Sequence, residues 1–333
     1  MRVVSLKQPG GLDNLTVVEQ DQPTPGPHDI LVRWHATSLN FHDYLVAKGA
    51  IPVAEGRIPM SDGAGEVVAV GDYVSSWQPG DKVMSLFFPN WQGGRPVAAN
   101  TAAICGESVD GFAAEYSCVT ENAVTEIPHG YSYAEAATLP CAAVTAWRAL
   151  VVEGQMKSGD TVLVQGTGGV SLFGLQLAKA ANATVIATSS SEEKLDKLRS
   201  MGAQHVINYK GDEKWGKTVS KLTSGGVDHV IDIGASATIA HSVDAVAYGG
   251  HITAVGILGG RKGQFDFPKL FFKHARITGV AVGSREMQQD MVKAIDVSSW
   301  KPVLDRSFTL EELADAFRHQ ESGAHFGKIV VEY

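Results

Sequence analysis

Apolar and polar positions follow two different periods along this chain, and the change of period separates its parts. Up to about residue 127, short apolar runs such as Leu31–Trp34 and Glu66–Val70 are broken by proline and glycine, as in the turn at 78–83. Short runs bounded by turns are typical of strands in a compact β domain. We therefore predict a first domain over residues 1–127.

Strands and helices are predicted to alternate from residue 128 to residue 274. The strand-like runs are Thr161–Val164, Thr184–Ala187, His205–Ile207, Val227–Asp232 and His251–Val255. Such alternation indicates an α/β fold with a doubly wound parallel sheet. The remaining residues, 275–333, contain a predicted helix at Glu311–Phe317 and a final strand at Lys328–Tyr333, and we expect this segment to return to the first domain.

A glycine-rich turn follows the first strand of this alternating region. Gly166, Gly168 and Gly169 lie between that strand and a helix-period segment. Backbone N–H groups and the positive end of the helix would face a pyrophosphate there, and the absence of Cβ atoms would let it approach. The third position of the G-x-G-x-x-G motif is Ser171, so an ordinary tight turn is the alternative.

Two observations favour a binding site for a dinucleotide cofactor at this turn. Apolar or small residues share one helical face, as a helix on a sheet requires; they are Val170, Phe173, Gly174, Leu177, Ala178 and Ala181. The next strand ends in the serines of 189–191, about 20 residues after the glycines, where such sites hold the ribose.

Composition narrows the classes of function. The 333 residues are 44% hydrophobic, enough for two domains, and the formal net charge of -8 argues against nucleic acid or an anionic membrane as partner. Three scattered cysteines do not form a disulfide framework, which indicates a reducing compartment. The chain starts without an apolar signal core and has no run of 18 apolar residues. We therefore expect a cytoplasmic enzyme that acts on a small molecule.

Five motifs together resemble those of a known family. They are Ser38–Asp43, Ser61–Val67, Pro79–Val83, Leu139–Trp147 and His325–Lys328. In this order the whole chain resembles the medium-chain dehydrogenase/reductase superfamily, and within it the quinone oxidoreductase and zinc-less "zinc-type alcohol dehydrogenase-like" branch. The resemblance implies a GroES-like β-rich catalytic domain (1–127), a Rossmann NADP-binding domain (128–274) and a return segment (275–333).

The resemblance also allows a test for catalytic zinc. Zinc members carry a cysteine, a His-Glu pair and a second cysteine or aspartate. This chain has Asn40 in the first place and Ser61 and Asp62 in the second, and it retains only Cys141. One thiolate without an imidazole holds zinc poorly. The four-cysteine structural lobe is also missing, because residues 87–112 contain one cysteine. We predict no metal site.

Without a Lewis acid, reduction of a polarised C=C bond is less demanding than alcohol oxidation, because conjugation delocalises the charge left by hydride addition. We therefore predict reduction of an enone or quinone, with Asn40, His42 and Asp43 as the catalytic candidates. His42 matches the proton-relay hydroxyl of zinc members; it either delivers a proton or only hydrogen-bonds Asp43 or the cofactor ribose. Asn40 either donates to the substrate carbonyl or ties down its own loop. The tyrosines of quinone reductases are absent, since Leu45 and Ile51 stand in their places.

The end of the second Rossmann strand indicates the cofactor. Enzymes that prefer NAD carry an acidic residue there, whereas this chain has Ser189 and Ser190, with Lys194 one helical turn later. We predict NADPH, because no carboxylate repels the extra phosphate and Lys194 can bind it, unless Lys194 pairs with Glu193. The resemblance implies further contacts: Tyr209 beside the phosphate, Thr145 near the nicotinamide, Gly256 at its carboxamide, Lys328 at the pyrophosphate, and Val170 with the glycines.

Two other functions remain open at this point. One is a zinc-independent, NADP-linked alcohol dehydrogenase or carbonyl reductase, and the other is an NADPH-binding, redox-responsive protein with little turnover. The aromatic residues of 87–95 could line a substrate cleft or an interface. In relatives the last Rossmann strand, placed here at about His251–Ile257, lies at a sheet edge. Exposed apolar edges are normally covered or paired, so we expect a homodimer.

Overall fold

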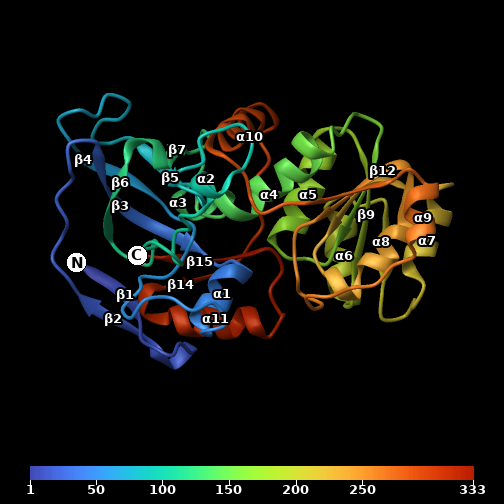
Figure 1. The fold of residues 1–333 in the computed structure, drawn as a ribbon, viewed down its shortest axis with the longest axis horizontal. Helices are drawn as coiled ribbons and strands as arrows, with labels where there is room; N and C mark the ends of the chain where they lie inside the picture. Colours follow the sequence, from blue (N-terminus) through green and yellow to red (C-terminus); the bar gives the residue numbers. More distant parts are fainter. The chain divides into compact units, whose positions relative to one another are not determined.

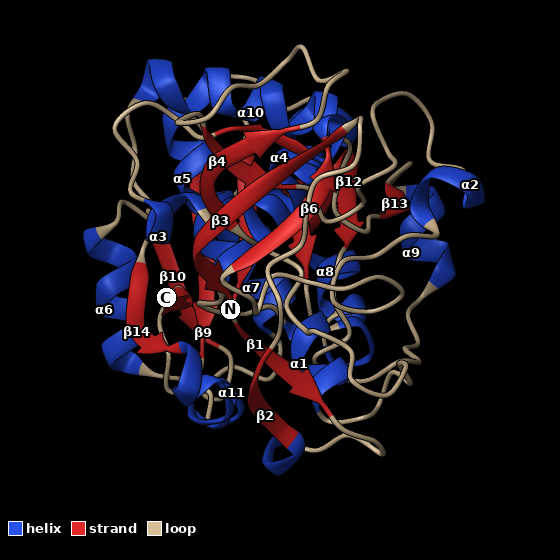
Figure 2. Cartoon of the chain, turned by 90° about the vertical axis from the view of Figure 1, so that its left-hand side faces the viewer, coloured by secondary structure: helices blue, strands red, loops and turns tan.

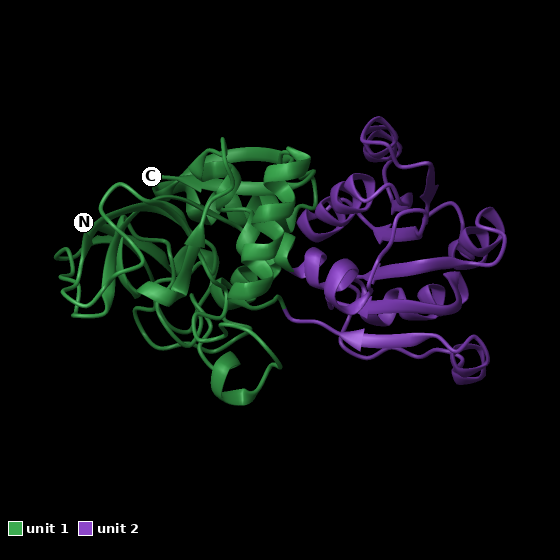
Figure 3. Cartoon of the chain, turned by 90° about the horizontal axis from the view of Figure 1, so that it is seen from above, with its two compact units in different colours: residues 1–144, 282–333 green, residues 145–281 purple.

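The computed structural model describes all 333 residues, which form two compact units (Figure 3). Unit 1 comprises residues 1–144 and 282–333, and unit 2 comprises residues 145–281. These boundaries fall later than the predicted ones at 127 and 274. Helix α3 (Tyr133–Ala136) contacts strands of the first sheet, and strand β13 (Arg276–Gly279) pairs with the second, so both extend their units.

Unit 1 is built on a seven-stranded sheet and a two-stranded one. The large sheet has the order β14-β15-β3-β4-β5-β7, with β6 also paired to β3. Its strands are β3 (Asp29–Ser38), β4 (Ala64–Val70), β5 (Lys82–Ser85), β6 (Tyr116–Thr120), β7 (Val124–Glu126), β14 (Leu304–Thr309) and β15 (Lys328–Glu332); the small sheet pairs β1 (Arg2–Leu6) with β2 (Leu15–Glu19). Antiparallel pairing of β15 with β3 shows that the end of the chain returns to unit 1.

The helices of unit 1 are short, apart from two near the end of the chain. They are α1 (Phe41–Ala47), α2 (Ala98–Thr101), α3, α10 (Arg285–Ser298) and α11 (Leu313–Glu321). The predicted helix at 311–317 is a 3-10 turn, Leu310–Glu312, followed by α11. The helical stretch Tyr133–Glu153, which includes α4 (Val144–Trp147), is long and apolar enough to cross a membrane, but 72% of its apolar window is buried, which is typical of a core helix.

Unit 2 is a six-stranded parallel sheet covered by helices (Figures 1 and 2). The strand order is β10-β9-β8-β11-β12-β13. The strands are β8 (Thr161–Gln165), β9 (Thr184–Ser189), β10 (His205–Asn208), β11 (Val227–Asp232), β12 (Val246–Ala254) and β13; the helices are α5 (Gly169–Ala180), α6 (Glu192–Ser200), α7 (Trp215–Leu222), α8 (Ile239–Ala245) and α9 (Phe267–Phe272). The predicted doubly wound sheet is confirmed.

One prediction about this sheet is wrong. The segment at His251–Ile257 was expected at the edge, but β12 lies between β11 and β13. The short strand β13, Arg276–Gly279, forms the edge instead. Its four residues were missed because they carry only one strongly apolar side chain, Ile277, and so lack the pattern of a buried strand.

Helices cover both faces of the parallel sheet because successive side chains of a strand point to opposite faces. Leu163 of β8 and Val230 of β11 share one core cluster with α7 and α8. Their chain neighbours, Val164 and Ile231, face α5, where they lie within 3.2 Å and 2.6 Å of a Cβ atom built at Gly174. Helix α5 can lie this close to the sheet only because residue 174 has no side chain.

The contact at Gly174 predicts a stability difference between two glycines of the same segment. Gly174→Ala should lower the free energy of unfolding by about 1–3 kcal/mol, the usual cost of overpacking a core. Gly168→Ala is the control, because its Cβ would meet nothing within 4 Å and its φ is -77°; as an N-cap change it should cost at most about 1 kcal/mol. Urea unfolding of both variants measures this, and equal losses would contradict the proposed close contact.

Candidate active site

The cofactor candidates of unit 2 come together at the carboxyl ends of its strands. The strands are parallel, so the loops after β8, β9, β10 and β12 all leave from that end of the sheet. These loops carry Gly166, Ser190, Tyr209 and Gly256, respectively. The strand order reverses between β8 and β11, and a crevice at such a switch point is where α/β sheets bind ligands.

The glycine turn has the geometry of an anion cradle. Gly166 has a φ of +73°, in the left-handed region that glycine adopts without strain. The N-cap of α5 is Gly168, which has no side chain to cap the helix. The N–H groups of the first turn, including those of Gly169 and Val170, have no partner within the helix. A Cβ built at Gly168 would meet nothing within 4 Å, so the space beside it is open. Ser171 is used differently, since its hydroxyl donates to the Gln165 carbonyl inside the unit. The turn fits a dinucleotide pyrophosphate.

Hydroxyl groups, and no carboxylate, stand at the end of β9. Ser189 is 3% exposed, and its Oγ accepts a hydrogen bond from the Ser191 backbone N–H at 3.3 Å. Ser190 is half-buried, and Tyr209, 42% exposed, donates its backbone N–H to the Ser189 carbonyl. The residues predicted around the ribose therefore lie next to one another.

Lys194 lies in the first turn of α6. The N-cap of this helix is Ser191, whose Oγ accepts from the Lys194 backbone N–H. Glu193 pairs with Lys197 at 2.7 Å, and the charge of Lys194 also lowers the pKa of Glu193, so the interaction of Lys194 with Glu193 that the sequence left open stays open.

The remaining predicted residues of unit 2 are buried or closely packed. A Cβ at Gly256 would lie 2.5 Å from the Ile233 carbonyl oxygen, so the chain passes there only as glycine. Thr145 is 5% exposed.

In unit 1, the Asp43 carboxylate holds two loops together. Asp43 is 1% exposed, and its Oδ2 accepts from the backbone N–H of Asn40, the N-cap of α1, at 3.0 Å. Its Oδ1 accepts from the Ser61 N–H at 2.9 Å. The preceding residue, Met60, has a φ of +80°, a conformation that costs a non-glycine residue about 1–3 kcal/mol. Asp43 therefore stabilises a strained turn, and both of its oxygens are engaged.

Asn40 lies in a buried polar cluster with Asp62 and Lys328. The Asn40 Nδ2 donates to Asp62 Oδ2 at 2.8 Å and to Ser61 Oγ at 3.2 Å, and its Oδ1 accepts from Lys328 Nζ at 2.6 Å. Because both amide hydrogens are used inside the protein, the geometry supports the loop-holding role of Asn40 over donation to a substrate.

The structure places Lys328 in this cluster, whereas the resemblance implied a pyrophosphate contact. Lys328 is 3% exposed, and its ammonium also donates to the Leu39 carbonyl at 2.6 Å and lies 3.8 Å from Asp62 Oδ2. Burial raises the pKa of Asp62 to about 7, although the nearby ammonium of Lys328 acts in the opposite direction.

His42 lies between two carboxylates, one of which the sequence did not reveal. Its Nδ1 is 3.4 Å from Asp43 Oδ1, and its Nε2 is 2.7 Å from Glu107 Oε2. Burial lowers the pKa of His42, but the hydrogen bonds and charges of Asp43 and Glu107 outweigh burial and raise it to about 9. Glu107 is 65 residues from His42 in a loop without a recognisable motif, so no local signal identifies it.

Aromatic residues of the 87–95 segment border this histidine. The ring of Phe87 meets His42 edge-on with a centroid distance of 5.2 Å, and Phe88 contacts Phe87 in turn. Trp91 is fully buried. The segment therefore forms an apolar wall inside unit 1 next to His42.

The donor groups in this cluster do not fit zinc. The places of the zinc ligands hold an amide at Asn40, a hydroxyl and a carboxylate at Ser61 and Asp62, and the thiol of Cys141. One thiol without an imidazole holds zinc poorly. Among the 333 described residues, no group of three or more His, Cys, Asp or Glu side chains is placed to hold a metal ion.

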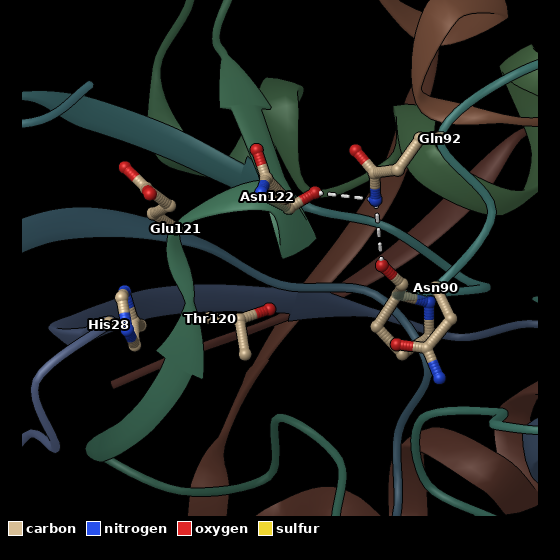
Figure 4. A pocket seen from close by; sticks show the side chains of 7 residues that line it. His28, Asn90, Gln92, Thr120, Glu121 and Asn122 are labelled. Carbon is tan, nitrogen blue, oxygen red and sulfur yellow. Dashed lines mark hydrogen bonds between the residues drawn. The ribbon is translucent and has the colours of Figure 1, made fainter. Parts of the chain in front are cut away.

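A surface depression of about 370 Å³ lies elsewhere in unit 1 (Figure 4). It is lined by His28, Pro89, Asn90, Gln92, Thr120, Glu121 and Asn122. None of these residues belongs to the clusters around His42 and Asp62, and the only hydrogen bonds drawn among them join Gln92 to backbone carbonyls. The catalytic candidates of the sequence, Asn40, His42 and Asp43, are not among the residues that line this depression.

Comparison with known proteins agrees with both units. Residues 26–129 match the alcohol dehydrogenase GroES-like domain, and residues 169–298 match the zinc-binding dehydrogenase domain. A zinc-type alcohol dehydrogenase-like protein of Schizosaccharomyces pombe is 38% identical over 100% of this chain and 99% of its own length.

Two solved structures add detail. The crystal structure of an NAD-dependent alcohol dehydrogenase is 32% identical, with a TM-score of 0.92 over 100% of both chains. The 2-octenoyl-CoA carboxylase reductase CinF, in complex with NADP and 2-octenoyl-CoA, is 25% identical, with a TM-score of 0.88 over 99% of this chain and 87% of its own. These similarities show that the chain belongs to the medium-chain dehydrogenase/reductase superfamily and is an oxidoreductase of that family.

Proposed function

We propose that this protein is an NADPH-dependent reductase that transfers hydride to an activated C=C bond or a quinone without catalytic zinc. The observation that carries the proposal is the cluster of Asn40, Asp62 and Lys328, where an amide, a carboxylate and an ammonium stand in the place of a zinc centre. The similarity to CinF, whose structure holds NADP and an enoyl thioester, supports this class of reaction.

The two units supply different parts of such a reaction. The glycine turn of unit 2 would bind the cofactor pyrophosphate, and the bound cofactor would supply the hydride. In unit 1, His42 is charged at neutral pH and 18% of its side chain is exposed, so it can stabilise negative charge on a substrate oxygen and donate a proton. Phe87 shields one side of the imidazole and gives that side an apolar surface suited to a conjugated substrate.

A zinc-independent alcohol dehydrogenase or carbonyl reductase is the second candidate. The similarity to the NAD-dependent alcohol dehydrogenase favours it. Alcohol oxidation needs a group that accepts the hydroxyl proton, however, and His42 already carries its proton at neutral pH because its pKa is about 9. A low-turnover NADPH-binding protein would have the same cradle and is distinguished only by the lack of turnover.

Turnover and metal content should be measured on the same sample. We expect NADPH consumption with enones or quinones to exceed that with aldehydes, and the rate to be unchanged by a chelator, because the donor set does not fit zinc. Loss of activity with chelator, restored by zinc alone, would contradict the metal-free proposal. Faster NADP-linked oxidation of alcohols would favour the alcohol dehydrogenase. Binding of NADPH without turnover of any substrate would favour the low-turnover NADPH-binding protein.

We propose NADPH over NADH because of the residues after β9. Ser189 and Ser190 leave room for a 2′-phosphate, and Lys194 in the first turn of α6 supplies a cation that can reach it. Tyr209, whose backbone N–H donates to the Ser189 carbonyl, is 42% exposed. No acidic residue stands at 189–191 to bind both ribose hydroxyls of NADH.

Two variants test this preference. Lys194→Ala should weaken NADPH by roughly 10- to 150-fold, the equivalent of one charged hydrogen bond, and leave NADH nearly unchanged. Ser189→Asp should reject NADPH by repulsion and offer NADH a partner for its ribose. Titration of both cofactors against wild type and variants measures the effect. Equal losses for the two cofactors, or a wild-type preference for NADH, would overturn the assignment.

We also propose that the protein is a homodimer of the cytoplasm, joined through the β13 edge of unit 2. Apolar side chains around this edge are exposed; they are Tyr248, Leu258, Phe267, Phe271, Phe272 and Ile277, at 36–75%. The Gly249 N–H donates to the Lys273 carbonyl, which ties the start of β12 to the end of α9. A second copy would pair the unpaired backbone groups of β13 and cover this surface.

Light scattering tests the dimer. Wild type should have twice the chain mass of 35.4 kDa, and Ile277→Lys should shift it to the monomer by placing a charge in the interface. Val297→Lys is the matched control, because Val297 is an apolar residue 88% exposed on α10 of unit 1. A monomeric wild type at micromolar concentration would remove the proposal.

A further inference from the structure

The loop that carries Glu107 is built to hold that residue in place. The Ile104 carbonyl accepts hydrogen bonds from the backbone N–H groups of Glu107, Ser108 and Val109, and Gly106 donates back to the Val109 carbonyl. Gly106 has a φ of +79°, which favours glycine. These bonds close a tight turn with Glu107 at its tip.

The same turn rests on the strained segment at Met60. A Cβ at Gly106 would lie 2.8 Å from the Met60 backbone nitrogen, so the turn and residue 60 are in close contact. The Phe112 N–H donates to the Met60 carbonyl at 2.9 Å, and the Cys105 side chain is buried against the sheet. The position of Glu107 is thus coupled to the segment that leads into Ser61 and Asp62.

Two features of its surroundings disfavour the charged form of His42, and two carboxylates offset them. His42 lies in the first turn of α1, where a positive side chain opposes the partial charge of the exposed N–H groups. The side chain is also mostly buried, which further disfavours the charged form. Asp43 is at 3.4 Å, but it also accepts two backbone N–H groups, whereas Glu107 contacts the imidazole at 2.7 Å. These two carboxylates are the charged groups that face the ring, and the third neighbour, Phe87, is uncharged.

We propose that Glu107 is the positioning residue of this site, which keeps His42 protonated and oriented so that an imidazolium provides positive charge and a proton to the reacting substrate. The inference rests on the reductase function proposed above, but the protonation of His42 can be measured without any substrate. It assigns a role to the loop at 104–109, which carries none of the family motifs quoted above.

The proton balance of the proposed reduction fits this arrangement. After hydride addition the substrate carries an extra electron pair as an enolate. The Nδ1–H bond of His42, whose contact with Asp43 is the longer one at 3.4 Å, breaks; its electrons remain on the imidazole, and the proton forms the second new bond of the product, while the Nε2–H stays hydrogen-bonded to Glu107. The His42 side chain is 18% exposed, so its Nδ1 can regain a proton from water after the step.

Glu107→Gln removes the negative charge and keeps the shape of the side chain, because the amide oxygen can still accept a hydrogen bond from the imidazole N–H. In NMR titrations of the histidine-labelled full chain, with His42 assigned by its loss in His42→Gln, the His42 pKa should be about 9 in wild type. It should fall by about 1–3 units in Glu107→Gln, the usual effect of one neighbouring charge. Glu107→Asp, which keeps the charge, should restore part of the shift.

Asp110→Asn is the matched control. It removes a negative charge from the same loop, but Asp110 pairs with Arg57 and has no contact with His42. An unchanged His42 pKa in Glu107→Gln, or an equal shift in Asp110→Asn, would overturn the inference. Thermal melting of each variant checks that the fold is kept.

The pH dependence of kcat tests whether the positive charge of His42 matters for the reaction. Because His42 loses its proton as pH rises through its pKa, the kcat of wild type should fall near pH 9, and the falling limb should move to lower pH in Glu107→Gln by the shift seen in NMR. A limb that stays in place while the His42 pKa moves would refute the catalytic part. If no substrate is turned over, the reductase function fails, and the NMR result still decides whether Glu107 keeps His42 protonated.

Discussion

The buried ammonium of Lys328 is the constraint on which the polar cluster of unit 1 depends. A charge that leaves water must be paired and hydrogen-bonded, and here the partners are the Leu39 carbonyl, the Asn40 amide oxygen and the Asp62 carboxylate. These groups come from three distant parts of the chain. The antiparallel pairing of β15 with β3 brings them together, because it sets Val330 opposite Ser38.

Around this ammonium, each polar side chain supports the next. Asn40 joins Lys328 to Asp62, and the Asn40 backbone N–H is held by Asp43. Asp43 in turn holds the strained turn at Met60 and contacts His42. A metal would organise such a site through its own coordination; in this chain a connected set of hydrogen bonds among buried side chains has that task. His42, whose side chain is 18% exposed, lies at the end of this set.

Unit 2 depends on a simpler, more local constraint. Close approach of backbone is required at Gly174, where α5 meets the sheet, and at Gly256, where the chain passes residue 233. The open space at Gly168 has the opposite meaning, since nothing in the protein fills it. Glycines that look alike in the sequence therefore allow close packing in one place and leave open space in another.

The sequence by itself determined the features that depend on neighbouring residues. The strand and helix periods predicted the doubly wound sheet, which is confirmed, because these signals are local. The glycine turn and the serines after β9 are local signals as well, and the dinucleotide site that they indicate stays a prediction. Only the tertiary structure decided the rest. It paired Glu107 with His42, buried Lys328 beside Asn40 and placed β13 at the sheet edge. Those contacts join residues far apart along the chain, and a local sequence pattern does not identify which distant side chain contacts a given residue.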